Sequence, residues 1–249
     1  NQVRIMQYVR FRDPAGTIRN GILEGNLVKF SNVSYQLDEI DLLAPVEPSK
    51  IICVGKNYAD HAAEMDSEVP DSLMLFIKTP NTIADPNTTV TVLGGKERID
   101  HEGELAIVIG QQCRFVSEEN AMDVVAGYTA ANDLSNRDDQ FQEQNWVRGK
   151  AFDSSLPLGP AMVDKEDVPE NASVVVRVNG EIRQEGSIDQ LIYSIPVIIA
   201  EITEYITLEQ GDVIITGTPA GVGPLNDGDV VEVDIEGIPT LKNTIRIPE

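Results

Sequence analysis

Three carboxylates lie at the ends of apolar, strand-like runs, where an uncompensated charge is costly. Glu102 and Glu104 lead into the apolar run 105–110, and Asp133 follows the run 127–131. Residues two apart in a strand face the same side, so Glu102 and Glu104 should point together toward the interior. One hard divalent cation would neutralise all three and keep positions for substrate, which predicts a Mg²⁺ or Mn²⁺ site. For any single Glu-x-Glu in so acidic a chain, the alternative is a solvated surface.

His61 is one of two histidines, and it shares a predicted helix over residues 57–65 with Glu64. At a spacing of i, i+3 the two side chains lie on one face of that helix. A carboxylate that orients an imidazole and raises its basicity suits a base that activates water. The alternative is an ordinary surface histidine–glutamate pair. His101 precedes Glu102 and should face away from the cation, in a structural role.

The glycine-rich stretch 216–224 follows a predicted strand and leads into a turn. It contains no Gly-Lys-Ser/Thr and no helix follows it, so a nucleotide-binding loop is disfavoured. A tight loop that presents hydroxyl and N–H groups to a substrate carboxylate fits better. A plain structural turn is the alternative.

Several basic residues lie among apolar or uncharged polar neighbours. In so acidic a protein, a few basic groups beside a cleft would define an anion pocket. Each of them taken alone could equally pair with one of the many acids. The residues are Lys78, Arg137, Arg148 and Lys150.

The pattern of apolar residues and turns predicts an α+β fold with a mainly β core. Residues 1–49 are expected to form a small β-rich N-terminal domain, and residues 50–249 the catalytic domain, with a linker at 44–48. Isoleucines at helical spacing predict a helix over 188–208, and segment 136–146 is expected to be loop or short helix. Strands are expected over 3–11, 18–23, 27–30, 51–55, 74–78, 105–109, 127–131, 174–178, 181–184, 212–216 and 230–235.

Charge and length limit the function classes. The chain has 249 residues with 19 basic and 41 acidic side chains, a net charge of 19 − 41 = −22. This excess argues against nucleic acid or an anionic membrane as a partner, and no apolar run is long enough to span a bilayer. No charged-then-apolar leader opens the sequence, so a cytoplasmic protein is expected. Cys53 and Cys113 lie in or beside apolar runs and should be buried, reduced thiols.

Several short segments keep a fixed order along the chain: CVGKNYADH (53–61), FIK (76–78), EGEL (102–105), NDLSNRD (132–138), WVRGK (146–150) and GDVIITGTP (211–219). Together they closely resemble the fumarylacetoacetate hydrolase family. No single segment is diagnostic, but the ordered set is highly specific and covers residues 50–249. The resemblance weakens over residues 1–49, where some members of the family carry a small N-terminal domain.

The resemblance implies a mixed β-roll that binds Mg²⁺ or Mn²⁺ and is usually a homodimer. The metal ligands would be Glu102, Glu104 and Asp133. His61 with Glu64 would form the water-activating dyad, and Lys150 would stabilise developing negative charge. The remaining matched positions would hold carboxylate or carbonyl oxygens of a small keto-acid substrate: Tyr58, Lys78, Arg137, Gln140, Thr216, Gly217 and Thr218.

The family acts on short keto acids and β-diketo acids. A divalent cation chelated by the oxygens of a 2-oxo acid withdraws electrons and stabilises an enolate. With water activated at His61, attack on the more distant carbonyl would break a C–C bond in an acylpyruvate such as fumarylpyruvate, which is the predicted hydrolase reaction. Without that attack, the same chemistry gives oxaloacetate decarboxylation or isomerisation of 2-hydroxyhepta-2,4-diene-1,7-dioate. A non-catalytic metal-binding protein is a further alternative, and the full set of acids, base and cations argues against it.

The acids are spread along the chain and lysine is scarce, which is typical of proteins adapted to high intracellular salt. A merely acidic protein is the alternative. The Debye length falls from about 30 Å at 0.01 M to about 3 Å at 1 M salt, so screening should relieve self-repulsion. With metal saturating, we expect the melting temperature to rise through molar KCl in a circular dichroism melt, and metal removal at low salt to lower it further. A melting temperature that stays flat across this range would contradict the halophilic interpretation.

Overall fold

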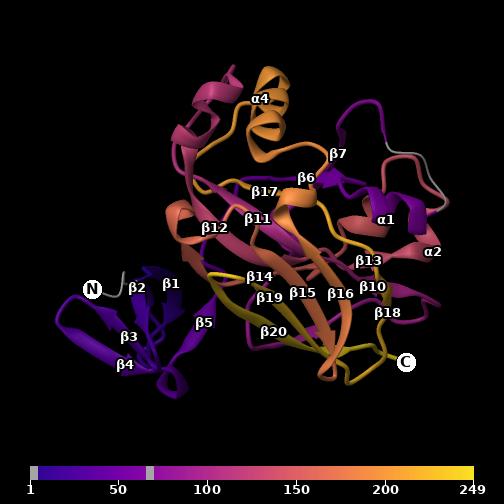
Figure 1. The fold of residues 1–249 in the computed structure, drawn as a ribbon. Helices are drawn as coiled ribbons and strands as arrows, with labels where there is room; N and C mark the ends of the chain where they lie inside the picture. Colours follow the sequence, from indigo (N-terminus) through magenta and orange to yellow (C-terminus); the bar gives the residue numbers. More distant parts are fainter. Residues whose placement is uncertain (1–4, 66–69) are drawn as a thin grey trace.

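The computed structural model describes residues 5–65 and 70–249, in which one large sheet carries most of the fold (Figure 1). Its strands are β1 (Gln7–Arg12), β2 (Ile18–Glu24), β3 (Leu27–Phe30), β4 (Val33–Gln36), β5 (Asp41–Leu43), β6 (Ile51–Gly55), β7 (Met74–Lys78), β8 (Ile83–Ala84), β11 (Gly103–Ile109), β12 (Val125–Asn132), β14 (Leu156–Val163) and β17 (Val213–Ile215). They are ordered β4-β3-β2-β1-β14-β12-β11-β17-β6-β7, with β5 beside β1 and β8 beside β14.

A second sheet packs against β11, β12 and β14 of the first. It contains β9 (Thr89–Thr91), β15 (Ser173–Val178), β16 (Glu181–Ser187), β19 (Val230–Ile235) and β20 (Ile238–Arg246), in the order β16-β15-β19-β20-β9. A third sheet, in the order β13-β10-β18, contains β10 (Ile99–His101), β13 (Ser135–Asn136) and β18 (Gly223–Pro224). The α-helices are α1 (Ala59–Glu64), α2 (Arg137–Gln140), α3 (Val147–Lys150) and α4 (Ile195–Tyr205). The short 3₁₀ helices are η1 (Leu37–Glu39), η2 (Pro80–Thr82), η3 (Glu118–Val124), η4 (Lys165–Asp167) and η5 (Ile188–Gln190).

Strand β11 is buried along its whole length and separates two apolar clusters. Leu105 and Ile107 belong to the larger cluster, with residues of the second sheet and of α4. Ala106 belongs to the other cluster, with residues of β6, β14 and β17. Because alternate residues of a strand face opposite sides, Glu104 shares the face of Ala106, and its carboxylate enters the interior at the end of that cluster.

The N-terminal strands β1–β5 form their own apolar cluster, to which β14 contributes Ala161. The pairs Gln7–Val163 and Tyr8–Met162 join β1 to β14 in an antiparallel ladder. Figure 1 shows these indigo strands set to one side of the remaining chain. The sheet therefore runs on through the region that the sequence divides at residue 49, and the division into two domains stays a prediction.

The α+β, mainly β fold class predicted from the sequence is confirmed. The strands predicted over 174–178 and 181–184 are confirmed as β15 and β16, which form an antiparallel hairpin with Asn179-Gly180 at its turn. The helix predicted over 188–208 is wrong in its first part: α4 begins at Ile195 with Pro196 in its first turn, and η5 and a loop precede it. Residues 3–4 of the strand predicted over 3–11 lie outside the described ranges.

Two long strands escape the sequence prediction. Strand β14 contains Pro157, Gly159 and Pro160. These residues predict an interruption of the strand, because proline has no N–H to donate to the hydrogen bonds between strands. The pairing of β12 with β14 shifts register between Tyr128 and Ala130, and this irregularity accommodates them. Strand β20 follows the turn at Gly237, whose φ of 90° suits glycine.

Both cysteines are buried free thiols, as the sequence predicts. Burial raises the pKa of the Cys53 thiol well above its ordinary value, so it stays protonated and unreactive. Within residues 5–65 and 70–249, no helix combines the length and the apolar character needed to cross a bilayer.

Asp212 fastens the parallel pair β6–β17 at its base. Its carboxylate accepts hydrogen bonds from the Ser49 N–H at 2.9 Å, the Ser49 hydroxyl at 2.7 Å and the Glu209 N–H at 2.8 Å, and lies 2.6 Å from the Lys50 ammonium. Burial acts to raise the pKa of Asp212, but these donors outweigh it and hold the pKa below its ordinary value. The two strands lead directly into the segments that carry Lys56–His61 and the glycine-rich loop.

We expect Asp212→Asn to lower the free energy of unfolding by about 1–3 kcal/mol at pH 7. Because the folded pKa lies below the unfolded one, this stabilisation is present above about pH 4 and is lost as the pH falls through the folded value. Urea unfolding of wild type and variant at pH 7 and pH 3 measures the difference, with the exposed Asp123→Asn as control. An equal loss at both pH values would contradict a role for the ionised carboxylate.

Candidate active site

The three predicted metal ligands meet where β11 and β12 pair. Glu104 lies in β11, Glu102 comes just before β11, and Asp133 comes just after β12. These positions lie close together because the antiparallel register sets Gly103 opposite Asn132. The Asp133 N–H donates to the Glu102 carbonyl oxygen at 2.8 Å, which holds the two ends together. One ligand oxygen from each carboxylate lies within 4.8 Å of the others, and the residues are only 4, 2 and 0 % exposed.

The charges of this triad favour a bound cation. Burial and the neighbouring carboxylates of Asp133 and Glu102 raise the pKa of Glu104 well above its ordinary value. That repulsion is what a hard cation would relieve, and an all-oxygen ligand set is the one that Mg²⁺ and Mn²⁺ prefer. The residues present therefore fit a divalent cation of this kind.

Two lysines neutralise the triad, Lys150 from the cavity wall and Lys78 from behind it. The Lys150 ammonium, delivered by α3, lies 2.8 Å from Glu102 and 2.7 Å from Asp133, and donates to the Ser135 hydroxyl at 2.6 Å. Burial acts to lower the pKa of Lys150, but Asp133 and Glu102 raise it above its ordinary value. Lys78 lies 2.8 Å from the other oxygen of Asp133, and burial lowers its pKa. Both ammonium groups are thus part of the buried charge balance of the site.

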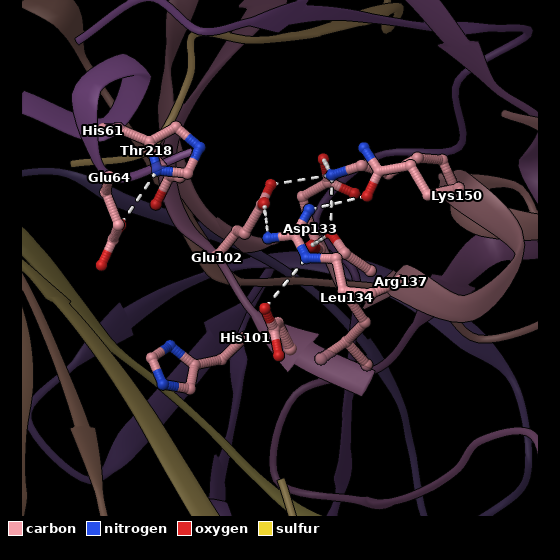
Figure 2. Close-up of polar contacts among 12 residues, drawn as sticks. His61, Glu64, His101, Glu102, Asp133, Leu134, Arg137, Lys150 and Thr218 are labelled. Carbon is pink, nitrogen blue, oxygen red and sulfur yellow. Dashed lines mark hydrogen bonds and ion pairs between the residues drawn. The ribbon is translucent and has the colours of Figure 1, made fainter. Parts of the chain in front are cut away.

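Arg137 also contacts the triad, and Figure 2 shows that it reaches Glu102 from the same side as Lys150. Its guanidinium donates to Asp100 at 2.9 Å, to the Gln140 amide oxygen at 2.7 Å and to Glu102 at 2.5 Å. Asp100 in turn accepts a bidentate pair from Arg98 at 2.8 and 2.9 Å. Burial acts to raise the pKa of Glu102, but Lys150 and Arg137 lower it well below its ordinary value, so Glu102 stays ionised.

The predicted histidine–glutamate pair forms on α1. His61 Nδ1 lies 3.3 Å from Glu64 Oε2, and both Glu64 oxygens accept from the Gly221 N–H, at 3.0 and 3.1 Å. Figure 2 shows the other ring nitrogen of His61 pointing away from Glu64, toward the side on which Glu102 lies. The glycine-rich loop therefore holds Glu64, and Glu64 orients the imidazole.

A cavity of about 250 Å³ opens beside the triad. Its wall includes eight of the predicted site residues: His61, Glu102, Glu104, Asp133, Arg137, Gln140, Lys150 and Thr218. Lys56, Phe76, Phe141 and Trp146 also line it, and the sequence did not single them out. The volume lies below the range of roughly 300–1,000 Å³ typical of drug-sized ligands, so it suits a short-chain molecule.

The other predicted site residues lie behind this wall rather than in it. Tyr58 and Lys78 are buried, the Thr216 hydroxyl donates to the Leu105 carbonyl oxygen at 3.0 Å, and the Gly217 N–H donates to Glu104 at 2.7 Å. Of these four residues, Lys78 and Gly217 contact the carboxylate triad, and none lines the cavity. Arg148, one of the predicted anion-pocket cations, has a side chain 75 % exposed and pairs with Glu143.

Gln184 is a supporting residue that sequence reasoning missed. It is 1 % exposed and reaches the site from β16. Its amide oxygen accepts from the Gly103 N–H at 3.1 Å, and its amide group donates to the Thr218 hydroxyl at 2.7 Å. His101, expected to be structural, lies 2.9 Å from the same amide oxygen, and burial lowers its pKa. Nothing in the segment EIRQEGS (181–187) sets this glutamine apart from a surface residue.

The family model for the fumarylacetoacetate hydrolase C-terminal domain matches residues 50–246. The chain belongs to this family. It is 44 % identical over 225 residues to oxaloacetate tautomerase YisK of Bacillus subtilis, covering 85 % of this chain and 75 % of that one. The family assigned from short sequence segments is thereby confirmed, and the chain is a fumarylacetoacetate hydrolase-superfamily enzyme.

Solved structures of similar proteins share the fold over most of this chain. A 5-carboxymethyl-2-hydroxymuconate delta-isomerase from Mycobacterium smegmatis is 38 % identical, with a TM-score of 0.90 over 98 % of this chain and 100 % of that one. A fumarylpyruvate hydrolase from Pseudomonas aeruginosa, solved with Mn²⁺ and pyruvate, is 29 % identical, with a TM-score of 0.76 over 88 % of this chain and 93 % of that one. These relatives carry different activities on one fold, so the family alone does not select the reaction.

We expect Glu104→Gln to weaken Mn²⁺ binding by more than about 100-fold in isothermal titration calorimetry. Loss of a metal ligand should reduce metal affinity at least as much as loss of a residue that only hydrogen-bonds to a ligand. The variant should still fold, because a neutral amide replaces a carboxyl group whose ionised form is disfavoured by burial and by the neighbouring carboxylates. Glu118→Gln, on exposed η3, removes the same charge elsewhere and should leave the affinity unchanged. Wild-type affinity in Glu104→Gln would contradict the ligand assignment.

Proposed function

We propose that the chain is a Mg²⁺- or Mn²⁺-dependent enzyme that moves a proton on short, enolisable 2-oxo acids. One observation carries this proposal: the oriented His61 lines the same small cavity as the buried carboxylate triad. A base next to a cation site is the arrangement needed to exchange a proton while negative charge develops on a carbonyl oxygen.

The dyad defines the proton path. Glu64 accepts from Nδ1 of the neutral ring, which leaves the other nitrogen, Nε2, as the acceptor for a substrate or water proton. The Gly221 N–H keeps Glu64 in place, so the ring does not need to reorient when it becomes positively charged. The negative carboxylate of Glu64 then stabilises the imidazolium.

The triad and Lys150 handle the opposite charge. Glu102, Glu104 and Asp133 would hold a divalent cation, which would supply Lewis-acid polarisation of the 2-oxo group. Lys150, within 2.8 Å of Glu102, brings a positive group to the same wall of the cavity and stabilises oxyanion character there. Arg137 donates to the carboxylate of Glu102 and limits its motion, and the Gln140 amide oxygen in turn holds the Arg137 guanidinium.

Keto–enol tautomerisation of oxaloacetate is the reaction that requires the fewest catalytic groups at this site. It needs His61 to take a proton from carbon and return one to oxygen, with no attacking water. The Bacillus subtilis relative named oxaloacetate tautomerase supports this choice. Oxaloacetate decarboxylation and isomerisation of 2-hydroxyhepta-2,4-diene-1,7-dioate use the same stabilised enol and belong to the same assay panel.

Acylpyruvate hydrolysis, the reaction predicted from the sequence, is the second candidate. The same His61 would take its proton from water, and the hydroxide formed would attack the distal carbonyl carbon and release an acid and the enol of pyruvate. The Pseudomonas aeruginosa fumarylpyruvate hydrolase, which shares the fold, supports it. A homodimer and a cytoplasmic location, also expected from the sequence, are part of the same proposal.

We expect His61→Ala to slow oxaloacetate tautomerisation, followed by enol absorbance with Mn²⁺ saturating, by about 10²–10⁴-fold, because a general base is worth that much. Glu64→Gln should cause a smaller loss, and Mn²⁺ affinity should be unchanged in both. Acetylpyruvate cleavage measured in parallel separates the two candidate reactions. Full tautomerase activity in His61→Ala would contradict the role of the dyad.

A further inference from the structure

Lys56 is the unusual basic residue of the cavity. Within the described ranges it is the one lysine or arginine side chain that makes no hydrogen bond, ion pair or ring contact. In a chain with 41 acids and 19 bases, an unpaired ammonium group is unexpected. It lines the cavity that holds His61 and the carboxylate triad.

The other basic residues in the cavity wall are already paired. Arg137 donates to Asp100, Gln140 and Glu102, and Lys150 contacts Glu102 and Asp133. Arg137 could bind a substrate carboxylate only by giving up a buried carboxylate partner, which is costly, and the proposed function already places Lys150 at the 2-oxo end of the substrate. Lys56 is therefore the cation in this wall that is free to receive a negatively charged group of the substrate.

The backbone holds Lys56 in place. Its φ of 54° lies in the left-handed region, which costs energy for a residue with a side chain and is common at functional sites. The next residue, Asn57, is fully buried and donates to the carbonyl oxygens of Tyr193 and Thr216, at 3.1 and 2.9 Å. Lys56 thus leaves the end of β6 from a rigid point rather than from a flexible loop.

We propose that Lys56 binds the distal carboxylate of the substrate and so selects dicarboxylic over monocarboxylic 2-oxo acids. This inference rests on the proposed function, in which the triad and Lys150 receive the 2-oxo end. In a cavity of about 250 Å³, the far end of a short diacid stays close to the wall that Lys56 lines. An ammonium–carboxylate contact in a partly buried cavity is a charge-assisted hydrogen bond that a neutral chain end cannot replace.

The test compares two probes that do not need turnover: 2-oxoglutarate and its 5-methyl ester, which differ in the charge of the distal group. Isothermal titration calorimetry with Mg²⁺ saturating should show the diacid bound about 10- to 100-fold tighter by wild type. Lys56→Gln should remove this preference while leaving pyruvate affinity unchanged, and Lys56→Arg should keep it. Lys29→Gln, which removes the same charge from β3, should behave as wild type.

The outcomes separate the two proposals. If all three 2-oxo acids bind but Lys56→Gln keeps the wild-type preference for the diacid, the role of Lys56 is overturned and the 2-oxo acid site stands. Equal binding of diacid and ester by wild type overturns it in the same way. If none of the probes binds with Mg²⁺ present, the 2-oxo acid site itself is overturned, and the role of Lys56 with it.

Discussion

The structure depends on the balance of buried charges between β11, β12, α2 and α3. Glu102, Glu104 and Asp133 are held out of water, where an unpaired carboxylate costs several kcal/mol. The side chains of Lys150 and Arg137 contact these carboxylates at hydrogen-bonding distance. Removal of either basic side chain would therefore leave an uncompensated negative charge in the interior. This balance is a poor source of stability, since an apolar core of similar volume would cost less. Its retention makes sense as the preparation of a site for a doubly charged cation.

Distant segments of the chain meet to hold this charge cluster in place. Gln184 comes from the second sheet, and Thr218 from the loop after β17, and both hydrogen-bond to Gly103, between the two glutamates. The same loop reaches the dyad, where Gly221 holds Glu64. The glycine-rich stretch is therefore more than a plain turn, because its Gly217 N–H donates to Glu104 of the carboxylate triad while its Gly221 N–H donates to Glu64 beside His61.

What the sequence can reveal about this site follows from the range of each interaction. The spacing of Glu102 and Glu104 predicts a shared face, since alternation in a strand is local. Asp133 approaches the two glutamates only because β11 pairs with β12. No short segment of the sequence indicates this pairing, whereas the ordered set of family motifs does. Gln184 lies 81 residues from its partner Gly103, and no local pattern marks it.

The secondary structure shows the same difference between local patterns, which the sequence reveals, and long-range contacts, which it does not. Pro157 and Pro160 hide β14 because a proline-rich run normally ends a strand, yet neighbours on both sides hold it in the sheet. Isoleucine spacing extends the predicted last helix through residues 188–194, where Pro196 and the capping pair Ser187–Gln190 impose a different local structure. Lys78 shows a similar limit: its place in a family motif is evident from the sequence, but its burial behind Asp133 is a result of packing.

Anomalous diffraction from crystals grown with Mn²⁺ tests most directly whether the triad binds one divalent cation. We expect a single strong peak between Glu102, Glu104 and Asp133, with one oxygen of each at about 2.0–2.2 Å. We also expect this peak to disappear in crystals of Glu104→Gln. A Mn²⁺ peak elsewhere in the cavity, or none at the triad with Lys150 still bridging Glu102 and Asp133, would contradict a metal site at the triad.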